Sequence, residues 1–117
     1  MTEHPAVRRL LDEFPALPVG EYADDRELPY IIYGIVFTSY IKSCLHGGSQ
    51  SELTHIFSFL EEMAQSPDED ERDLLQVAVL ESLWDERFTF EATQKYMRPE
   101  TAKLFSAVGA YLYEPSK

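Results

Sequence analysis

The sequence predicts an all-α fold of about six helices, packed as a compact bundle or as stacked antiparallel helix pairs, with no sheet. Apolar residues recur at helical spacing along most of the chain. Prolines and small polar residues stand where these runs begin, and the connections are short, which favours antiparallel neighbours. The 117 residues, 44% of them hydrophobic and 13% aromatic, are enough to bury a core, so we expect a single domain over residues 1–117.

The first predicted helix runs from Ala6 to Phe14 and stops before Pro15, because proline disfavours helical geometry in the residue that precedes it. Its apolar face consists of Val7, Leu10, Leu11 and Phe14. Residues 15–27 contain two prolines, a glycine and four acids, and they predict a loop with an acidic end.

The longest apolar stretch, Leu28–Leu45, contains a single charge, Lys42, and predicts a helix over Pro29–His46. It is too long for one strand, since strands rarely exceed ~10 residues. A helix that is apolar nearly all round is expected to be central and surrounded by others. The pair Gly47-Gly48 predicts that it ends in the left-handed conformation.

Capping signals begin the next two helices. Ser49 with Glu52 three residues later fits a capping box, and the following apolar stripe is Leu53, Ile56, Phe57, Leu60, Met63 and Ala64. The run Ser66-Pro67-Asp68-Glu69 predicts a helix from Pro67 to about Glu86, with Ser66 as its cap. Its inward residues are expected to be Leu74, Leu75, Val77, Ala78, Leu80, Leu83 and Trp84.

Two further helices complete the prediction. A short one is expected over residues 90–97, and Pro99 opens the last, which ends near Pro115. The apolar stripe of the last helix is Leu104, Phe105, Val108, Tyr111 and Leu112.

The formal net charge is -11, with a sequence pI near 4.5. An acidic surface repels nucleic acid and anionic membranes and favours a basic partner, although acidity can also serve solubility alone. The N-terminal sequence lacks the apolar core of a signal peptide, and no run reaches the ~20 apolar residues of a membrane span. The single cysteine cannot form an internal disulfide, so we expect a cytoplasmic protein whose oligomeric state is open.

The spacing of residue types gives little support for catalysis. Glu52 and His55 have the Glu-x-x-His spacing of di-metal bundles, but neither His4 nor His46 follows a glutamate at that spacing to supply a second pair. Cys44 and His46 could supply two zinc ligands, but nothing completes a tetrahedral site. We therefore expect no metal, no cofactor and no enzymatic activity; a di-metal enzyme is the alternative that elemental analysis would test.

The acidic residues fall into three clusters that are candidates for partner binding. Four consecutive acids at a helix start exceed what capping requires, although the helix dipole favours acids there. The acid-rich loop and the helix end beside a tryptophan are the other two, and tryptophan suits both a core and an interface. The candidate residues are Tyr22, Asp24, Asp25 and Glu27; Asp68, Glu69, Asp70 and Glu71; and Trp84, Asp85 and Glu86.

Several segments along nearly the whole chain carry a resemblance to a known family. They are residues 10–15 (LLDEFP), residues 28–30 (LPY) with Gly34, residues 59–64 (FLEEMA), residues 80–83 (LESL) and residues 96–101 (YMRPET). With these segments, the chain resembles the small acidic helical immunity proteins of bacterial polymorphic-toxin and contact-dependent growth inhibition systems. The resemblance implies an all-helical protein without a catalytic motif that binds and blocks a cognate toxin, often a nuclease.

Two hypotheses follow for function. The first is an immunity protein whose acidic surface occludes a basic toxin, because a nuclease is basic around its phosphate-binding cleft and opposite potentials speed association. The alternative is a helical adaptor or regulatory module without a toxin partner. An adaptor would dock its partner through a groove and is expected to expose a contiguous apolar patch.

Overall fold

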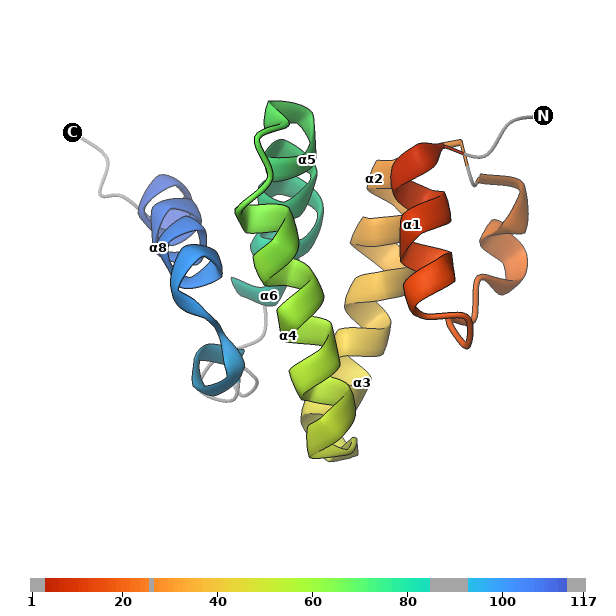
Figure 1. Ribbon diagram of the computed structural model, residues 1–117, viewed down its shortest axis with the longest axis horizontal. Coiled ribbons are helices and arrows are strands. Elements are labelled where there is room, and N and C mark those ends of the chain that lie inside the picture. Colours follow the sequence, from red (N-terminus) through yellow and green to blue (C-terminus); the bar gives the residue numbers. More distant parts are fainter. Residues whose placement is uncertain (1–3, 26, 85–92, 114–117) are drawn as a thin grey trace.

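The computed structural model describes residues 4–25, 27–84 and 93–113, and it confirms the all-α prediction (Figure 1). The described residues contain no strand. The helical elements are α1 (Pro5–Glu13), the 3₁₀ helix η1 (Gly20–Asp25), α2 (Pro29–Ile31), η2 (Ile32–Phe37), α3 (Thr38–Gly47), α4 (Gln50–Ala64), α5 (Glu69–Leu74), η3 (Leu75–Leu80), α6 (Glu81–Trp84), residues 93–96 and α8 (Pro99–Tyr113).

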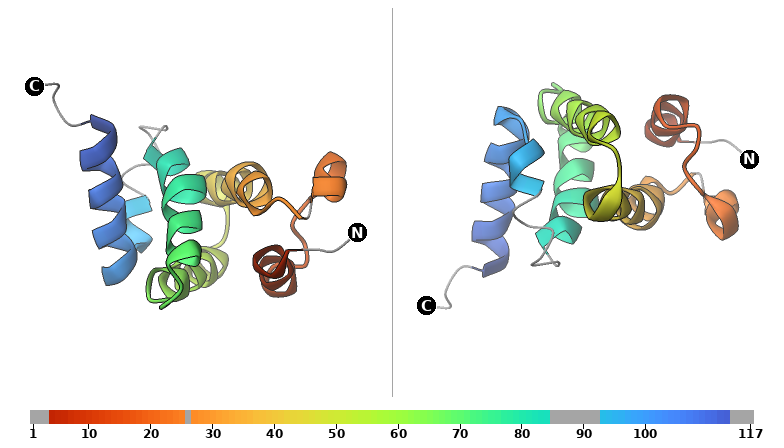
Figure 2. Two further views of the ribbon diagram at one scale, coloured as in Figure 1. Left: turned by 90° about the horizontal axis from the view of Figure 1, so that it is seen from above. Right: turned by 90° about the horizontal axis from the view of Figure 1, so that it is seen from below.

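Two of the predicted helices are continuous rods built from three pieces each. The rod α2–η2–α3 and the rod α5–η3–α6 both have a π-helical middle segment. Successive rods run antiparallel: α3 descends in Figure 1, α4 rises beside it, and α5–α6 descend again. Helix α8 packs on α4 and η3 on one side, while α1 and η1 lie at the opposite end (Figures 1 and 2). No helix in the described ranges is long and apolar enough to cross a membrane.

The core forms largely from the predicted apolar faces. Every residue of the stripe predicted for α4 is buried, and Phe105 and Val108 of α8 are buried as well. An aromatic cluster joins the start of the chain to the centre of the bundle, since the ring of Phe14 lies 5.4 Å from both Phe37 and Phe59. These contacts hold the C-terminal end of α1 against η2 and α4.

The π-helical segments change which residues face inward. Val77, expected in the core, is 44% exposed, whereas its neighbour Val79 is fully buried. A π-helix closes its hydrogen bonds at i→i+5 instead of i→i+4, so the buried face shifts along the sequence relative to a 3.6-residue period. The central helix is also less enclosed than expected, because Tyr30 and Ile35 are 45% and 43% exposed.

Three predicted boundaries need correction. The expected loop over residues 15–27 contains η1. Gly48 is extended, at φ -83° and ψ 176°, so α3 does not end in the left-handed conformation; glycine is needed there because a Cβ would lie 2.6 Å from the Cα of Cys44. Asp68, not Ser66, caps α5, so the helix begins at Glu69.

Ser66 is displaced from the cap position because its hydroxyl is used within the turn. It accepts the backbone N–H of Asp68 at 3.1 Å and donates to Glu71 at 2.8 Å. By contrast, Ser49 caps α4 as predicted, accepting the N–H of Glu52 at 3.1 Å.

Candidate functional site

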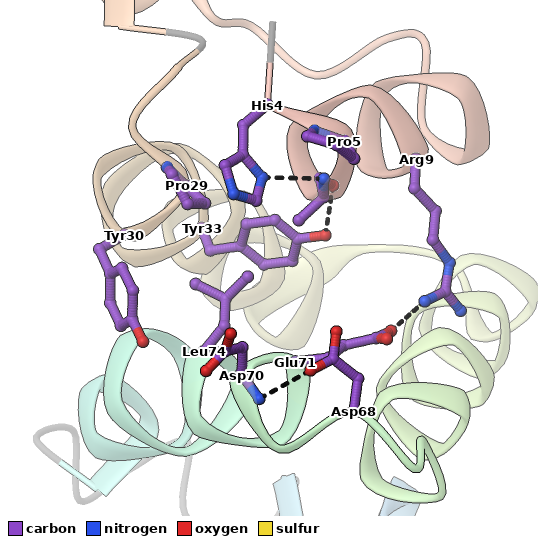
Figure 3. A pocket seen from close by; sticks show the side chains of 11 residues that line it. His4, Pro5, Arg9, Pro29, Tyr30, Tyr33, Asp68, Asp70, Glu71 and Leu74 are labelled. Atoms are coloured by element: carbon purple, nitrogen blue, oxygen red, sulfur yellow. Dashed lines mark hydrogen bonds and ion pairs between the residues drawn. The ribbon is translucent and has the colours of Figure 1, made fainter.

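A pocket of about 580 Å³ lies where α1, α2 and α5 begin (Figure 3). Its volume lies within the range of small-ligand sites. Its lining combines carboxylates, aromatic rings and small apolar groups from residues far apart in the sequence. The lining residues are His4, Pro5, Ala6, Arg9, Pro29, Tyr30, Tyr33, Asp68, Asp70, Glu71 and Leu74.

Three helix N-termini lie at this pocket, and a capping side chain or a proline begins each of them. His4 caps α1, with its Nδ1 accepting the backbone N–H of Ala6 at 3.0 Å. Proline begins α2 at position 29. Asp68 caps α5 by accepting the N–H of Asp70 at 3.0 Å. Helix N-termini carry partial positive charge, which stabilises the carboxylates of α5 locally.

Two tyrosines of the rod α2–η2–α3 form aromatic walls of the pocket. Tyr33 is buried, and its hydroxyl donates to the carbonyl oxygen of Ala6 at 2.7 Å; burial raises its pKa. Tyr30 is nearly half exposed, and its hydroxyl donates to Asp73. The hydrogen bond to Asp73, with some burial, raises the pKa of Tyr30 to about 12. Tyr30 is therefore held as a neutral phenol at the side of the pocket.

Arg9 is the cation in the lining, and two carboxylates bind it. Its guanidinium pairs with Glu71 and, at 3.0 Å, with Glu62, and it lies 5.0 Å from the ring centroid of Phe59. Burial opposes the charge, but Glu71 and Glu62 outweigh burial and raise the pKa of Arg9. Arg9 thereby links α1 to α4 and α5, and its charge is compensated inside the protein.

The pocket is left with an excess of negative charge. Three carboxylates line it, from Asp68, Asp70 and Glu71, against the guanidinium of Arg9 that Glu62 shares. Glu71 is tied to Arg9 and to Ser66. Asp68 and Asp70 are exposed, and Asp70 is close enough to the Tyr30 hydroxyl to contribute to its raised pKa. The uncompensated negative charge of the pocket therefore comes from Asp68, which caps α5, and from Asp70 in the first turn of α5.

The acidic loop cluster lies elsewhere. Tyr22, Asp24 and Asp25 belong to η1, which packs against α2 and η2 beyond α1, whereas α5 packs against η3 and α4 (Figures 1 and 2). Glu27 is exposed between η1 and α2. Tyr22 lines a smaller hollow of about 250 Å³ together with Pro18, Ile35, Val36, Ser39, Tyr40 and Ser43. The fold thus separates this cluster from the α5 cluster.

The tryptophan of the third cluster packs inward. The Trp84 ring stacks on Phe105 at 4.6 Å and 16°, and its Nε1–H donates to the Phe105 carbonyl oxygen at 2.9 Å. These contacts join α6 to α8. Asp85 and Glu86 lie outside the described residues, as does the start of the helix expected over residues 90–97, of which residues 93–96 are helical.

His55 and Cys44, considered for metal chemistry, have other contacts. The Nε2 of His55 lies 2.9 Å from the Glu13 carboxylate, and its ring packs 4.4 Å from Phe14. Cys44 is buried, and burial raises the pKa of its thiol. The histidine therefore connects α4 to the end of α1.

Comparison with known proteins places the chain in a family. A family model described as "Domain of unknown function (DUF7674)" matches residues 7–112. The chain belongs to this family. No curated protein and no solved structure is matched. The DUF7674 match covers Arg9, Tyr30, Tyr33 and the lining acids Asp68, Asp70 and Glu71, so most of the pocket lies within the family domain.

Sequence reasoning found the acids of this pocket but missed its other walls. His4, Arg9, Tyr30 and Tyr33 were not candidates, because each falls within a pattern that a helix cap or a core face explains equally well. Arg9 offered a weak signal: it is a cation on a short helix whose apolar face packs inward. Its partners in α4 and α5 could not be read from the sequence.

Proposed function

We propose that this protein is an immunity protein that acts in the bacterial cytoplasm, where it binds and blocks a cognate basic toxin through its acidic surface at the start of α5. A nuclease is the leading candidate for that toxin. The observation that carries the proposal is the pocket at the start of α5, whose carboxylates outnumber its one compensated guanidinium.

The physical reason is charge complementarity. A nuclease must hold phosphates, so its active-site cleft is positive, and a negative surface is both steered to that cleft and able to occupy it. Steered association can raise on-rates by ~10–10³-fold and falls steeply with salt. Fast capture suits the neutralisation of a lethal partner.

The contacts divide the candidate acids by role. Asp68, Glu69 and Asp70 are exposed, so they can face a partner. Glu71 is less accessible and is bound by Arg9 and Ser66, which gives it a structural role in addition to its charge. The proposed interface is therefore centred on Asp68, Glu69 and Asp70, here named the α5 acids.

The adaptor alternative would need a contiguous apolar surface. Among the described residues, the large apolar side chains that are most exposed are Leu28, Tyr30, Ile35 and Val77. Ile35 lines the smaller hollow whereas Tyr30 lines the acidic pocket. Tyr30 and Ile35 therefore do not line one common groove.

The test compares two matched triple variants. The first replaces the α5 acids by Asn, Gln and Asn, and the second replaces Glu21, Asp24 and Asp25 of η1 by Gln, Asn and Asn. Both variants lose three negative charges, so they have the same net charge. Asparagine at 68 keeps an acceptor for the cap of α5. The toxin to be tested is the variable C-terminal domain of a large secreted protein, sought in the adjacent upstream gene.

Co-expression with that domain should restore growth for the wild-type protein and the η1 variant, but not for the α5 variant. The on-rate measured by surface plasmon resonance should fall by at least ~10-fold for the α5 variant at low salt. Equal losses in both variants would indicate nonspecific electrostatics, and no rescue by the wild-type protein would reject the immunity function.

A further inference from the structure

The pocket at the start of α5 has the chemistry of a receptor for one extended cationic side chain. Apolar and aromatic groups, Leu74, Tyr30 and Tyr33, form walls, and the carboxylates of Asp68 and Asp70 stand at the same hollow (Figure 3). An alkyl stem would pack on the walls while a terminal cation meets the acids. An anion would be repelled by the carboxylates, and a purely apolar group would leave them without a partner.

We propose that this pocket receives a single arginine side chain of the partner, held between the Tyr30 ring and the carboxylate of Asp70. This inference rests on the proposed function and names the chemistry by which the toxin is recognised. A planar guanidinium stacks on aromatic faces and pairs with carboxylates in two-pronged geometry, whereas a lysine ammonium is a strongly hydrated point charge.

The pocket's own cation does not compete for this position. Arg9 is held by Glu71 and Glu62 on the α4 side of the pocket. His4 uses its Nδ1 to accept the Ala6 N–H that caps α1. The incoming guanidinium therefore meets Asp70 without competition from the Arg9 guanidinium.

The wall residue is positioned before any ligand arrives. The Tyr30 hydroxyl donates to Asp73, one turn beyond Asp70 on the same rod, which fixes the phenol against α5. A preset aromatic wall reduces the ordering cost of binding. Buried arginines against aromatic walls are frequent centres of binding energy at protein interfaces.

The first test uses the purified protein and a small probe, so it does not depend on a toxin. N-acetyl-arginine amide is titrated and followed by NMR through the amide signals of Asp70 and Glu71. N-acetyl-citrulline amide is the neutral control of the same shape, and N-acetyl-lysine amide tests a point cation. We expect saturable shifts for arginine alone, at millimolar concentration. Equal binding of citrulline or lysine, or no saturation by arginine, would overturn the proposal.

Two single substitutions locate the effect. Asp70→Asn removes a pocket carboxylate and should weaken arginine binding about fivefold, whereas Glu21→Gln removes the same charge from η1, outside the pocket lining, and should change it less than about twofold. Amide spectra of both variants check that the fold is intact. Equal effects of the two substitutions would indicate that arginine responds to the net charge of the protein and does not bind in the pocket.

Toxin binding by Asp70→Asn and Glu69→Gln, two variants within the α5 acids, separates this inference from the proposed function. If the toxin domain binds wild-type protein but Asp70→Asn and Glu69→Gln weaken it equally, the immunity function stands and the arginine pocket is rejected. If arginine amide binds as expected and no toxin is neutralised, the immunity function is rejected and the pocket remains an arginine receptor.

Discussion

The carboxylate of Glu61, on α4, caps α8 by accepting both the backbone N–H and the hydroxyl of Thr101, each at 2.9 Å. It also accepts the N–H of Glu100 at 3.1 Å and the amide of Gln65 at 3.2 Å. Glu61 is only 7% exposed. A buried charge is tolerated when hydrogen bonds satisfy it, so one side chain ties the last helix to the centre of the bundle.

Replacing Glu61 by glutamine should therefore destabilise the protein. The variant keeps the shape but loses the charge and turns an amide donor toward backbone donors, which should cost about 2 kcal/mol. Urea unfolding followed by circular dichroism measures the free energy of unfolding. Glu62→Gln on the same helix is the control, since its carboxylate is 64% exposed and should change stability by less than about 1 kcal/mol. Equal losses would contradict the capping role.

The Glu61 carboxylate should also make the free energy of unfolding depend on pH. Burial alone would raise the pKa of Glu61, but the hydrogen bonds from Thr101, Glu100 and Gln65 outweigh burial and lower it. Because its pKa is lower in the folded than in the unfolded protein, Glu61 contributes its full stabilisation above the unfolded pKa of about 4.3. This contribution to the free energy of unfolding is lost as the pH falls toward the folded pKa. The difference in unfolding free energy between wild type and Glu61→Gln should thus hold at neutral pH and shrink below about 4.3. An undiminished difference at about pH 3 would refute this assignment.

Arg9 and its neighbour Arg8 should differ in their contribution to stability. Arg9 pairs with Glu71 and Glu62, 62 and 53 residues away in the sequence, whereas Arg8 pairs with Asp12 on its own helix. Arg9→Gln should cost about 1 kcal/mol, a modest value because the side chain is 39% exposed. Arg8→Gln should change stability by at most about 0.5 kcal/mol. Urea unfolding at low and high salt would show the loss for Arg9 falling with salt, and a larger loss for Arg8 would contradict the assignment.

Two glycine-to-alanine substitutions should have opposite effects. A Cβ at Gly109 would lie 2.2 Å from the Trp84 ring, which its stacking and hydrogen bond to Phe105 hold in place. Gly109→Ala should therefore cost about 1–3 kcal/mol.

Gly47→Ala is the matched control, because a Cβ there meets nothing within 4 Å. It should stabilise the protein by about 0.5 kcal/mol through loss of unfolded-state freedom. Thermal melting of both variants is the measurement, and the fluorescence of Trp84, the only tryptophan, should shift for Gly109→Ala alone. A stabilised Gly109→Ala would show that the ring can move aside.

Sequence periodicity predicted the helices because the signal is local. The stripe of α4 and the Ser49 cap involve residues three or four apart, so a spacing of 3.6 residues was enough to find them. The same reasoning failed at Val77 and Val79, because the π-helical segment alters the period there. It also failed at Gly48, where the close approach of Cys44, not a left-handed turn, requires glycine.

The candidate site was predictable only in its charges. The acids of α5 stand out in the sequence, but nothing local shows that Arg9 compensates Glu71 or that Tyr30 lies beside Asp73. Such pairings depend on how helices far apart in the chain pack, and one sequence does not contain that register.

The sequence by itself therefore determined an acidic, all-helical protein, its main helices and most of its buried faces, since hydrophobic spacing and caps act over a few residues. Only the tertiary structure decided that the starts of α1, α2 and α5 meet in one pocket and that Glu61 caps α8. It also decided that Glu21, Asp24 and Asp25 of η1 lie apart from the α5 acids. The physical reason is the sequence range of the interactions. The burial pattern is set by residues a few positions apart on one helix, whereas charge pairing and pocket shape are set by contacts between helices.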